Sequence, residues 1–423
     1  MIKETDRKFL TGLFDAAVQA ADPRVVLSAH LPPPPKGRTV VIGAGKGAAQ
    51  MAAALEKIWP GPLQGVVVTR YGYSAPCQQI RVLEAAHPVP DQAGLAAGEA
   101  LFETVAGLGP DDLVIALICG GGSALLPAPP PGLTLQDEAA LNSALLASGA
   151  PISAMNAIRK QVSRIKGGRL AAAAHPARVV SLVVSDIPGD DAAQVASGPT
   201  IPDDRNLDDA LGLVAAYGID LPVAIKAYLA SAPVPAPRPE DAEFIRDEVH
   251  VIASAALSLQ AAKRLSEAQG IPAVILSDAI EGESREVAKM HAAIAQQVSQ
   301  KNQPFQRPIV ILSGGETTVT LSGDGGRGGR NTEFLLSLAL GLDGVQKVTA
   351  LAADTDGIDG SEDNAGAFVD GTTATRMRAA GHDPAQVLAR HDAWGAFDAV
   401  GDLFTPGPTG TNVNDFRAIL ISD

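Results

Sequence analysis

The sequence has few cysteines, few aromatic side chains and no long apolar run. Its two cysteines, Cys77 and Cys119, cannot form a disulfide framework or a cysteine-based zinc site. No stretch approaches the roughly 20 apolar residues of a membrane helix, and none follows the N-terminal residues as in a signal peptide. Lys and Arg number 33 against 47 Asp and Glu, and the net charge of −14 disfavours nucleic acid and anionic membranes as partners. We therefore expect a cytoplasmic globular protein that binds small molecules; a homo-oligomer is compatible with the sequence.

The length and the prolines indicate how the chain is organised. A chain of 423 residues suggests two or three domains. Proline runs within residues 31–36 and 232–239 are typical of stiff extended spacers. They predict one domain over residues 37–231 and a second over residues 240–423. Apolar residues at helical spacing predict a helix within residues 1–31, and since it precedes the first run, we expect it to join the second domain.

Apolar runs separated by helical segments predict an α/β fold. In the first domain we expect strands over residues 39–42, 65–69, 113–118 and 179–184. Runs that are apolar throughout suit strands buried on both faces, so the domain should be doubly wound, mostly parallel and Rossmann-like. In the second domain we expect a mixed sheet with strands over residues 249–252, 273–276, 309–312, 317–321, 348–353 and 416–421. The short link between residues 312 and 317 predicts a hairpin.

Many of the predicted strands end in glycine, where open α/β sheets bind their ligands. Backbone N–H groups of such loops can hold an anion. The first loop carries Lys46, which is either a solvated lysine or an anion ligand, because a cation at a helix start calls for an anion nearby. Ser123 in a later loop is either a helix N-cap or a ligand donor. The glycines concerned are Gly43, Gly45, Gly47, Gly120, Gly121, Gly122, Gly314 and Gly315.

The loop around Lys46 partly matches the dinucleotide fingerprint G-x-G-x-x-G/A. The acidic residue that would bind a ribose is missing, although Arg70 could serve a 2′-phosphate instead. The Walker spacing is absent. This motif alone therefore leaves the ligand open.

Other cations and carboxylates lie near predicted strand or helix ends. Residues 156–174 predict a basic helix, either a solvated face or a ligand site, and it carries Lys166 and Arg169. Arg330 at a glycine-rich helix start is expected to clamp an anion, because guanidinium binds phosphate and carboxylate in bidentate fashion. Carboxylates at strand ends are either turn-forming residues or a general base and Mg²⁺ ligands; these are Asp186, Asp190, Asp354 and Asp356.

Taken together, these motifs resemble the type-2 glycerate kinases, which join a glycerate kinase N-terminal domain to a MOFRL domain. The matching motifs are Gly43–Gly47, His87–Asp91, Gly120–Leu126, Ser163–Leu170, Ser185–Asp190, Ser197–Thr200, Ser313–Thr317, Gly329–Glu333, Thr355–Gly360 and Gly407–Asp415. The resemblance covers nearly the whole chain. It implies two α/β domains with a cleft between them, and ATP- and Mg²⁺-dependent phosphorylation of D-glycerate to 2-phosphoglycerate.

The resemblance also implies that Lys46 and Arg330 are the principal active-site cations. We expect Asp186 to act as the base and Asp190, Asp354 and Asp356 to hold metal. The expected substrate and nucleotide ligands are the glycines above with Ser123, Lys166, Arg169, Glu316, Arg327, Asn331, Thr409, Thr411, Asn412 and Asn414.

Three functions fit these residues. The first is an ATP-dependent glycerate 2-kinase, since phosphoryl transfer needs positioning and positive charge more than covalent chemistry. The second is an NAD(P)H-dependent hydroxypyruvate reductase that uses the partial fingerprint. The third is a non-catalytic protein that binds an organic acid.

Overall fold

The computed structural model describes residues 2–231, 234–321 and 325–423, so two residues of the second proline run, 232 and 233, lie outside it. The chain divides into two compact units. The middle unit is Pro23–Ile252, and the terminal unit combines Met1–Asp22 with Ala253–Asp423. The units therefore meet at residues 22–23 and 252–253, whereas the proline runs placed the domain boundaries at residues 37, 231 and 240. None of the helices in these described ranges has the length and apolarity of a membrane span.

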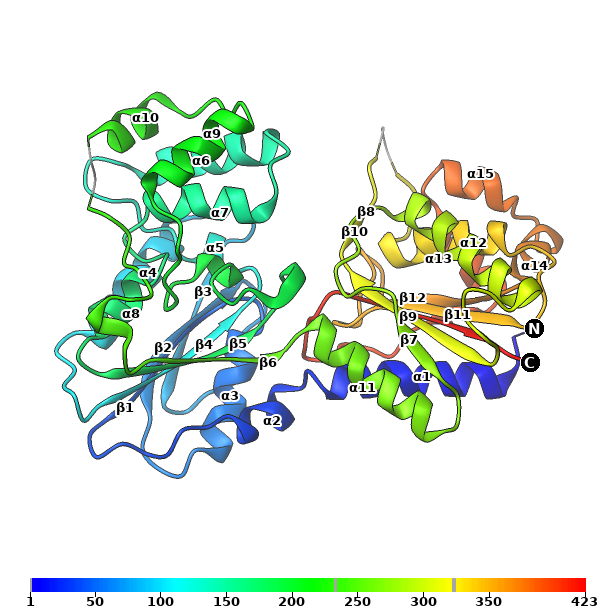
Figure 1. The fold of residues 1–423 in the computed structure, drawn as a ribbon, viewed down its shortest axis with the longest axis horizontal. Helices are drawn as coiled ribbons and strands as arrows, with labels where there is room; N and C mark the ends of the chain where they lie inside the picture. The colour runs from blue at the N-terminus through cyan, green and yellow to red at the C-terminus, as the bar shows by residue number, and fades with distance from the viewer. Residues whose placement is uncertain (1, 232–233, 322–324) are drawn as a thin grey trace. The chain divides into compact units, whose positions relative to one another are not determined.

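The middle unit is built on a six-stranded sheet in the order β3-β2-β1-β4-β5-β6 (Figure 1). Its first five strands pair in parallel. The strands are β1 (Thr39–Ala44), β2 (Gln64–Arg70), β3 (Ile80–Ala85), β4 (Leu113–Cys119), β5 (Arg178–Val184) and β6 (Glu248–Ala253). Every residue of β1 and β4 is buried, as expected of strands covered on both faces. The doubly wound, mostly parallel fold predicted for this region is confirmed.

Helices of the middle unit form two groups. One group packs against the sheet. In it, α4 (Gln92–Val105), α5 (Gly122–Leu125) and α8 (Arg169–Ala174) share one core with the strands, and α3 (Ala48–Ile58) contacts β2 and β4. The other group buries a separate core of its own, and its members lie together in Figure 1. These are α6 (Leu135–Ala147), α7 (Ile152–Gln161), α9 (Leu207–Ala216) and α10 (Val223–Ala230). Short helices α2 (Pro23–Val26), η1 (Leu27–Ala29), η2 (Pro188–Asp190), η3 (Val195–Ser197) and η4 (Ala242–Phe244) complete the unit.

The terminal unit has a mixed six-stranded sheet in the order β13-β12-β11-β14-β9-β7. Only β7 and β9 pair in parallel within it. Its strands are β7 (Ala273–Ile275), β9 (Ile309–Gly315), β11 (Val348–Asp354), β12 (Gly366–Asp370), β13 (Leu403–Phe404) and β14 (Asp415–Ile421). A separate two-stranded ladder joins β8 (Gly282–Glu283) to β10 (Thr317–Thr318).

Helices cover both faces of the terminal sheet. Along β9, Val310 and Leu312 face the core that includes α1 (Glu4–Gln19) and α11 (Ala255–Ala268). Ile309 and Ile311 face the opposite core, with α12 (Ser284–Lys301) and α13 (Arg330–Gly341). This alternation follows the two-residue period of a strand. The second core also includes residues of α14 (Thr373–Ala379), α15 (Pro384–Ala389) and α16 (Ala393–Ala399).

Three local predictions were wrong. The expected hairpin is absent from the described residues, because β9 pairs with β14 and β7, while β10 pairs in parallel with β8. The strand expected to open the second domain, β6, belongs to the middle sheet. The basic helix over residues 156–174 is two helices, α7 and α8, and the glycines between them have positive φ of 63° and 80°. The sequence reading also missed β3.

Helix α1 belongs to the terminal unit through its apolar face. Leu10, Leu13, Phe14 and Ala17 are buried at helical spacing. The Phe14 ring packs edge-on against Phe404 and Phe416, with ring centroids 5.0 and 5.9 Å away.

We predict that Phe14→Ala lowers the free energy of unfolding of the terminal unit by about 3–5 kcal/mol, because a large aromatic side chain leaves a cavity. The two tryptophans, Trp59 and Trp394, lie in different units. Guanidinium unfolding followed by Trp394 fluorescence in a Trp59→Phe background measures the effect. Leu257→Ala, at a side chain that is 42% exposed on α11, is the control. Equal effects of the two substitutions would show that α1 is not part of this core.

Candidate active site

The middle sheet reverses its strand order between β1 and β4, where open α/β folds have their ligand crevice. The loops that follow these two strands are joined there. The backbone N–H of Lys46 donates to the carbonyl oxygen of Gly120 at 2.9 Å. The two glycine loops predicted from the sequence are therefore brought together at the switch point.

Close packing explains several of these glycines without a ligand. A Cβ at Gly43 would lie 2.6 Å from the carbonyl oxygen of Leu117, and one at Gly45 would clash with the backbone of Cys119. Gly45 also has a φ of 135°, which L side chains rarely adopt. The Gly47 N–H donates to the Cys119 sulfur at 3.2 Å. Gly43, Gly45 and Gly47 therefore allow β1 and the loop after it to pack closely against β4.

Gly120 and Gly121 instead border polar side chains. A Cβ at Gly120 would clash with the carboxylate of Asp186, which follows β5. A Cβ at Gly121 would lie 3.0 Å from Lys46 Cγ and 3.2 Å from His87 Nε2. The two glycines thus make room for Asp186, Lys46 and His87 at one edge of the sheet.

Lys46 is half-buried, and no acidic side chain in the described ranges forms an ion pair with it. Burial and the charges of Lys46 and Arg70 lower the pKa of His87 to about 4. His87 is therefore neutral near pH 7. The sequence did not lead us to assign His87 a role, although the stretch His87–Asp91 is one of those that resemble the family.

Ser123 lies at the start of α5 and is not a side-chain cap there. Its hydroxyl shares a hydrogen bond of 2.9 Å with Ser197, which donates to Asn156 at 3.0 Å. Ser197 adopts a φ of 60° beside Ala196 at 52°. This buried chain of hydroxyls fixes the loop that holds Gly122.

The structure places Lys166 and Arg169 inside the middle unit. Lys166 is 1% exposed, and its ammonium donates to Glu138 at 2.6 Å and to the Leu126 carbonyl at 3.0 Å. Arg169 donates to the carbonyl oxygens of Lys160 and Lys166. Both side chains are occupied by structural partners, which favours stabilisation over ligand binding.

Arg330 begins α13 in the terminal unit, where three carboxylates surround it. Its guanidinium donates to Asp354 at 2.5 Å, to Asp415 at 2.6 Å and to Glu316 at 3.0 Å. Burial lowers the pKa of Arg330, but the three carboxylates outweigh burial and raise it. In the described structure this arginine is a paired cation rather than an open anion clamp.

Asp415 and Asp354 respond differently to burial. Burial would raise the pKa of Asp415, but Arg417 and Arg330 hold it below its ordinary value. Arg417 is 1% exposed and donates to Asp415 at 2.5 Å. Burial raises the pKa of Asp354; Arg330 opposes the rise, and the charges of Asp356 and Asp415 add to it. The pKa of Asp415 is thus lowered and that of Asp354 is raised, so Asp415 is the more readily ionised of the two carboxylates.

Asp359 anchors the start of α13 from another loop. Its carboxylate accepts the backbone N–H groups of Asn331 and Thr332 at 2.9 and 2.8 Å. Burial raises the pKa of Asp359 to about 6 even so. Asn331 also donates to Asp415 at 2.9 Å, while its carbonyl oxygen is buried without a described partner.

The remaining predicted ligands of the terminal unit mostly hold loops together. Arg327 pairs with Glu362 at 2.6 Å and stacks on Trp394. A Cβ at Gly315 would clash with Ile280, and one at Gly314 would lie 3.2 Å from Leu259. In the polar loop before β14, hydroxyl or amide groups bond to nearby backbone; the residues are Thr409, Thr411 and Asn412. Asn414 has a φ of 66° there.

The predicted metal ligands fall in different units, with Asp190 in the middle unit and Asp354 and Asp356 in the terminal unit. Among the residues that the structure describes, no three His, Cys, Asp or Glu side chains form a metal-binding group.

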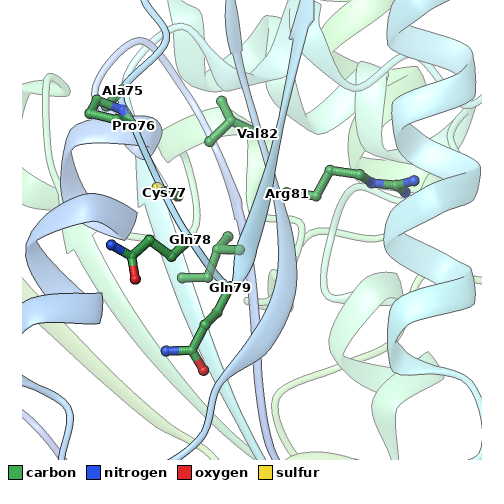
Figure 2. A pocket seen from close by; sticks show the side chains of 8 residues that line it. Ala75, Pro76, Cys77, Gln78, Gln79, Arg81 and Val82 are labelled. Carbon is green, nitrogen blue, oxygen red and sulfur yellow. The ribbon is translucent and has the colours of Figure 1, made fainter.

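A surface pocket of about 420 Å³ lies along residues 75–82, where the chain enters β3 (Figure 2). Figure 2 shows Arg81 pointing away from the side on which Cys77 and Gln78 lie. Burial raises the pKa of Cys77 to about 11, so its thiol stays protonated. No residue predicted for the site lines this pocket.

Comparison with known proteins gives full-length matches. Residues 9–230 match a family described as a domain of unknown function, DUF4147, and residues 309–415 match the MOFRL family. The D-glycerate 2-kinase of Thermotoga maritima is 38% identical and is matched over 99% of each chain. A protein of Agrobacterium vitis with the provisional name hydroxypyruvate reductase is 52% identical over 98% of this chain and 94% of its own. The crystal structure of a Thermotoga maritima glycerate kinase aligns with a TM-score of 0.89 at 37% identity, covering 99% of this chain and 100% of that one.

Lys46 and Lys166 of the middle unit allow a direct test of their roles. Lys166→Met leaves Glu138 buried without its partner, so it should lower the free energy of unfolding by about 3–5 kcal/mol. Lys46→Met removes a lysine that pairs with no acidic side chain among the described residues, and it should change the free energy of unfolding by less than about 0.5 kcal/mol. Denaturant unfolding followed by Trp59 fluorescence measures both. A similar loss for the two variants would contradict this assignment.

Proposed function

The chain belongs to the type-2 glycerate kinase family, and we propose that it is a glycerate 2-kinase, which transfers a phosphoryl group from ATP to the C2 hydroxyl of D-glycerate. One observation carries the proposal. Lys46, whose ammonium forms no ion pair within the described ranges, lies at the switch point of a chain that aligns end to end with a D-glycerate 2-kinase.

The middle unit supplies groups that phosphoryl transfer needs. Lys46 offers positive charge where negative charge shifts during the transfer, in a loop fixed by its hydrogen bond to Gly120. Asp186 lies against Gly120, half-buried, and is the carboxylate that would accept the proton of the C2 hydroxyl. In this role Lys46 positions and stabilises while Asp186 takes up the proton.

Arg330 can contact an anion only if it exchanges a partner. Glu316 is the exposed member of its three carboxylates, with a side chain that is 55% exposed against 7% for Asp354 and 0% for Asp415. An exposed pair contributes little to stability, so Glu316 is the partner that gives way. Arg330 would then present one edge of its guanidinium to a phosphoryl group.

Asp354 and Asp356 suit a Mg²⁺ ion that also binds phosphate. Mg²⁺ usually takes one or two carboxylates and keeps water or phosphate oxygens as its other ligands. Asp356 is half-buried and lies two residues after Asp354, whose pKa is raised partly by the charge of Asp356. When bound, the ion would neutralise charge on the phosphate oxygens.

A hydroxypyruvate reductase is the second candidate. The strand order of the middle sheet is that of dinucleotide-binding domains, and Arg70 ends β2, where such domains bind the ribose. Against this function, Gly43 and Gly45 are required by packing on β4. Hydroxypyruvate-dependent oxidation of NADPH, read by absorbance, would establish the reductase; ADP release with D-glycerate would establish the kinase. Glycerate binding without either reaction would leave a binding protein.

We expect Lys46→Ala to lose about 10²-fold in kcat, the usual effect of removing one preorganised donor. Arg330→Lys keeps the charge but loses the planar fork, and we expect a loss of roughly 10-fold or more. The measurement is ADP release with separate detection of 2- and 3-phosphoglycerate, alongside thermal melting. Lys57→Ala, an exposed lysine on α3, is the matched control. Turnover of Lys46→Ala near that of the control would exclude Lys46 from the site.

We expect excess chelator to abolish turnover and Mg²⁺ to restore it. Asp356→Asn should raise the Mg²⁺ concentration required for half-maximal activity by about 10-fold, since one charged ligand is lost. The KM for glycerate should stay unchanged. Asp363→Asn, at an exposed carboxylate nearby in the sequence, serves as the control. Full activity in excess chelator would contradict the proposed requirement for a metal ion.

A further inference from the structure

Three adjacent strands of the middle sheet are followed by nitrogen-bearing side chains. Lys46 follows β1, Arg70 ends β2 and His87 follows β3. The register pairs Ala44 with Val68 and Arg70 with Ala85. Because these strands are parallel, the three side chains arise from the same edge of the sheet.

The three groups are close enough to influence one another. Lys46 and His87 both border the position that a Cβ would fill at Gly121. The charges of Lys46 and Arg70 add to burial in lowering the pKa of His87. The guanidinium carbon of Arg70 lies 3.9 Å from the centre of the Tyr73 ring, so the arginine is packed over this ring.

The carboxylates nearby in the sequence accept hydrogen bonds from neutral groups. Asp91 accepts the hydroxyl of Tyr71 at 2.7 Å, and Glu84 accepts the N–H of Gly72 at 2.8 Å. Within the described ranges no ion pair joins an acidic side chain to Lys46 or Arg70. Two cations and a neutral imidazole therefore lie at one edge of the sheet, where Asp186 lies against Gly120, in a protein whose net charge is −14.

We propose that Arg70 and His87 act with Lys46 as a subsite for one oxyanion group, either the carboxylate of the organic acid or a phosphoryl group of the nucleotide. This inference rests on the proposed function and assigns ligands within it. The guanidinium offers two parallel N–H donors that match an oxyanion. Neutral His87 offers one ring N–H, and Lys46 adds a point charge.

His87 supplies a readout that does not depend on turnover. Binding an anion beside an imidazole favours its protonated form, so the pKa of His87 should rise from about 4 to about 5 or higher. NMR of isotope-labelled histidines, with His87 assigned by His87→Gln, follows this change. D-glycerate, ADP and inorganic phosphate are titrated separately at several pH values.

A response to glycerate alone assigns the subsite to the carboxylate, and a response to ADP and phosphate assigns it to a phosphoryl group. Arg70→Ala should weaken binding of that same ligand, and raise its KM, by about 10-fold or more. Arg81→Ala, one strand away on β3 and exposed, is the matched control and should keep both values.

The subsite is wrong if none of the three ligands shifts His87, or if Arg70→Ala and Arg81→Ala give the same KM. Either result leaves the proposed function standing when the wild-type protein phosphorylates glycerate. If instead His87 responds to glycerate but no ADP is released, the subsite stands and the kinase assignment fails.

Discussion

The buried carboxylate of Asp415 is the interaction on which the polar centre of the terminal unit depends. It begins β14 and accepts hydrogen bonds from Arg330 and Asn331 at the start of α13. It also accepts from Thr317 at β10 and from Arg417 on its own strand. Since an unpaired buried charge costs several kcal/mol, these elements are held in one arrangement around it. Arg417 also lowers the pKa of Asp415. It does so through its own contact with the carboxylate, which is separate from the contact that Arg330 makes.

The two units compensate their charges in opposite ways. At the edge of the middle sheet, Lys46 and Arg70 lack acidic partners in the described ranges. Around Arg330 and Arg417, carboxylates outnumber cations, with Asp354, Asp415 and Glu316 in direct contact. The first arrangement suits an anion and the second suits a cation or a cation-bound phosphate. A net charge of −14 for the whole chain conceals both.

The positions of strands along the sequence were predicted better than the strands with which they pair. Apolar runs located β1, β2, β4 and β5, because strands buried on both faces leave a continuous signal. The hairpin after β9 and the place of β6 were wrong, since pairing is decided by contacts far apart in the chain. The same limit applies to the site. Lys166 and Arg330 were recognised as unusual cations, yet their partners Glu138 and Asp415 lie 28 and 85 residues away.

Several glycines that were predicted to bind a ligand are instead required by contacts between segments far apart in the chain. A glycine is required wherever another backbone comes too close for a Cβ, with or without a ligand. Gly45 and Gly315 meet the backbones of Cys119 and Ile280, so packing alone accounts for them. At Gly121 the nearest neighbours are side-chain atoms of Lys46 and His87. A ligand site is therefore better indicated by a glycine that borders polar side chains able to form further hydrogen bonds. A glycine that borders only backbone does not indicate such a site.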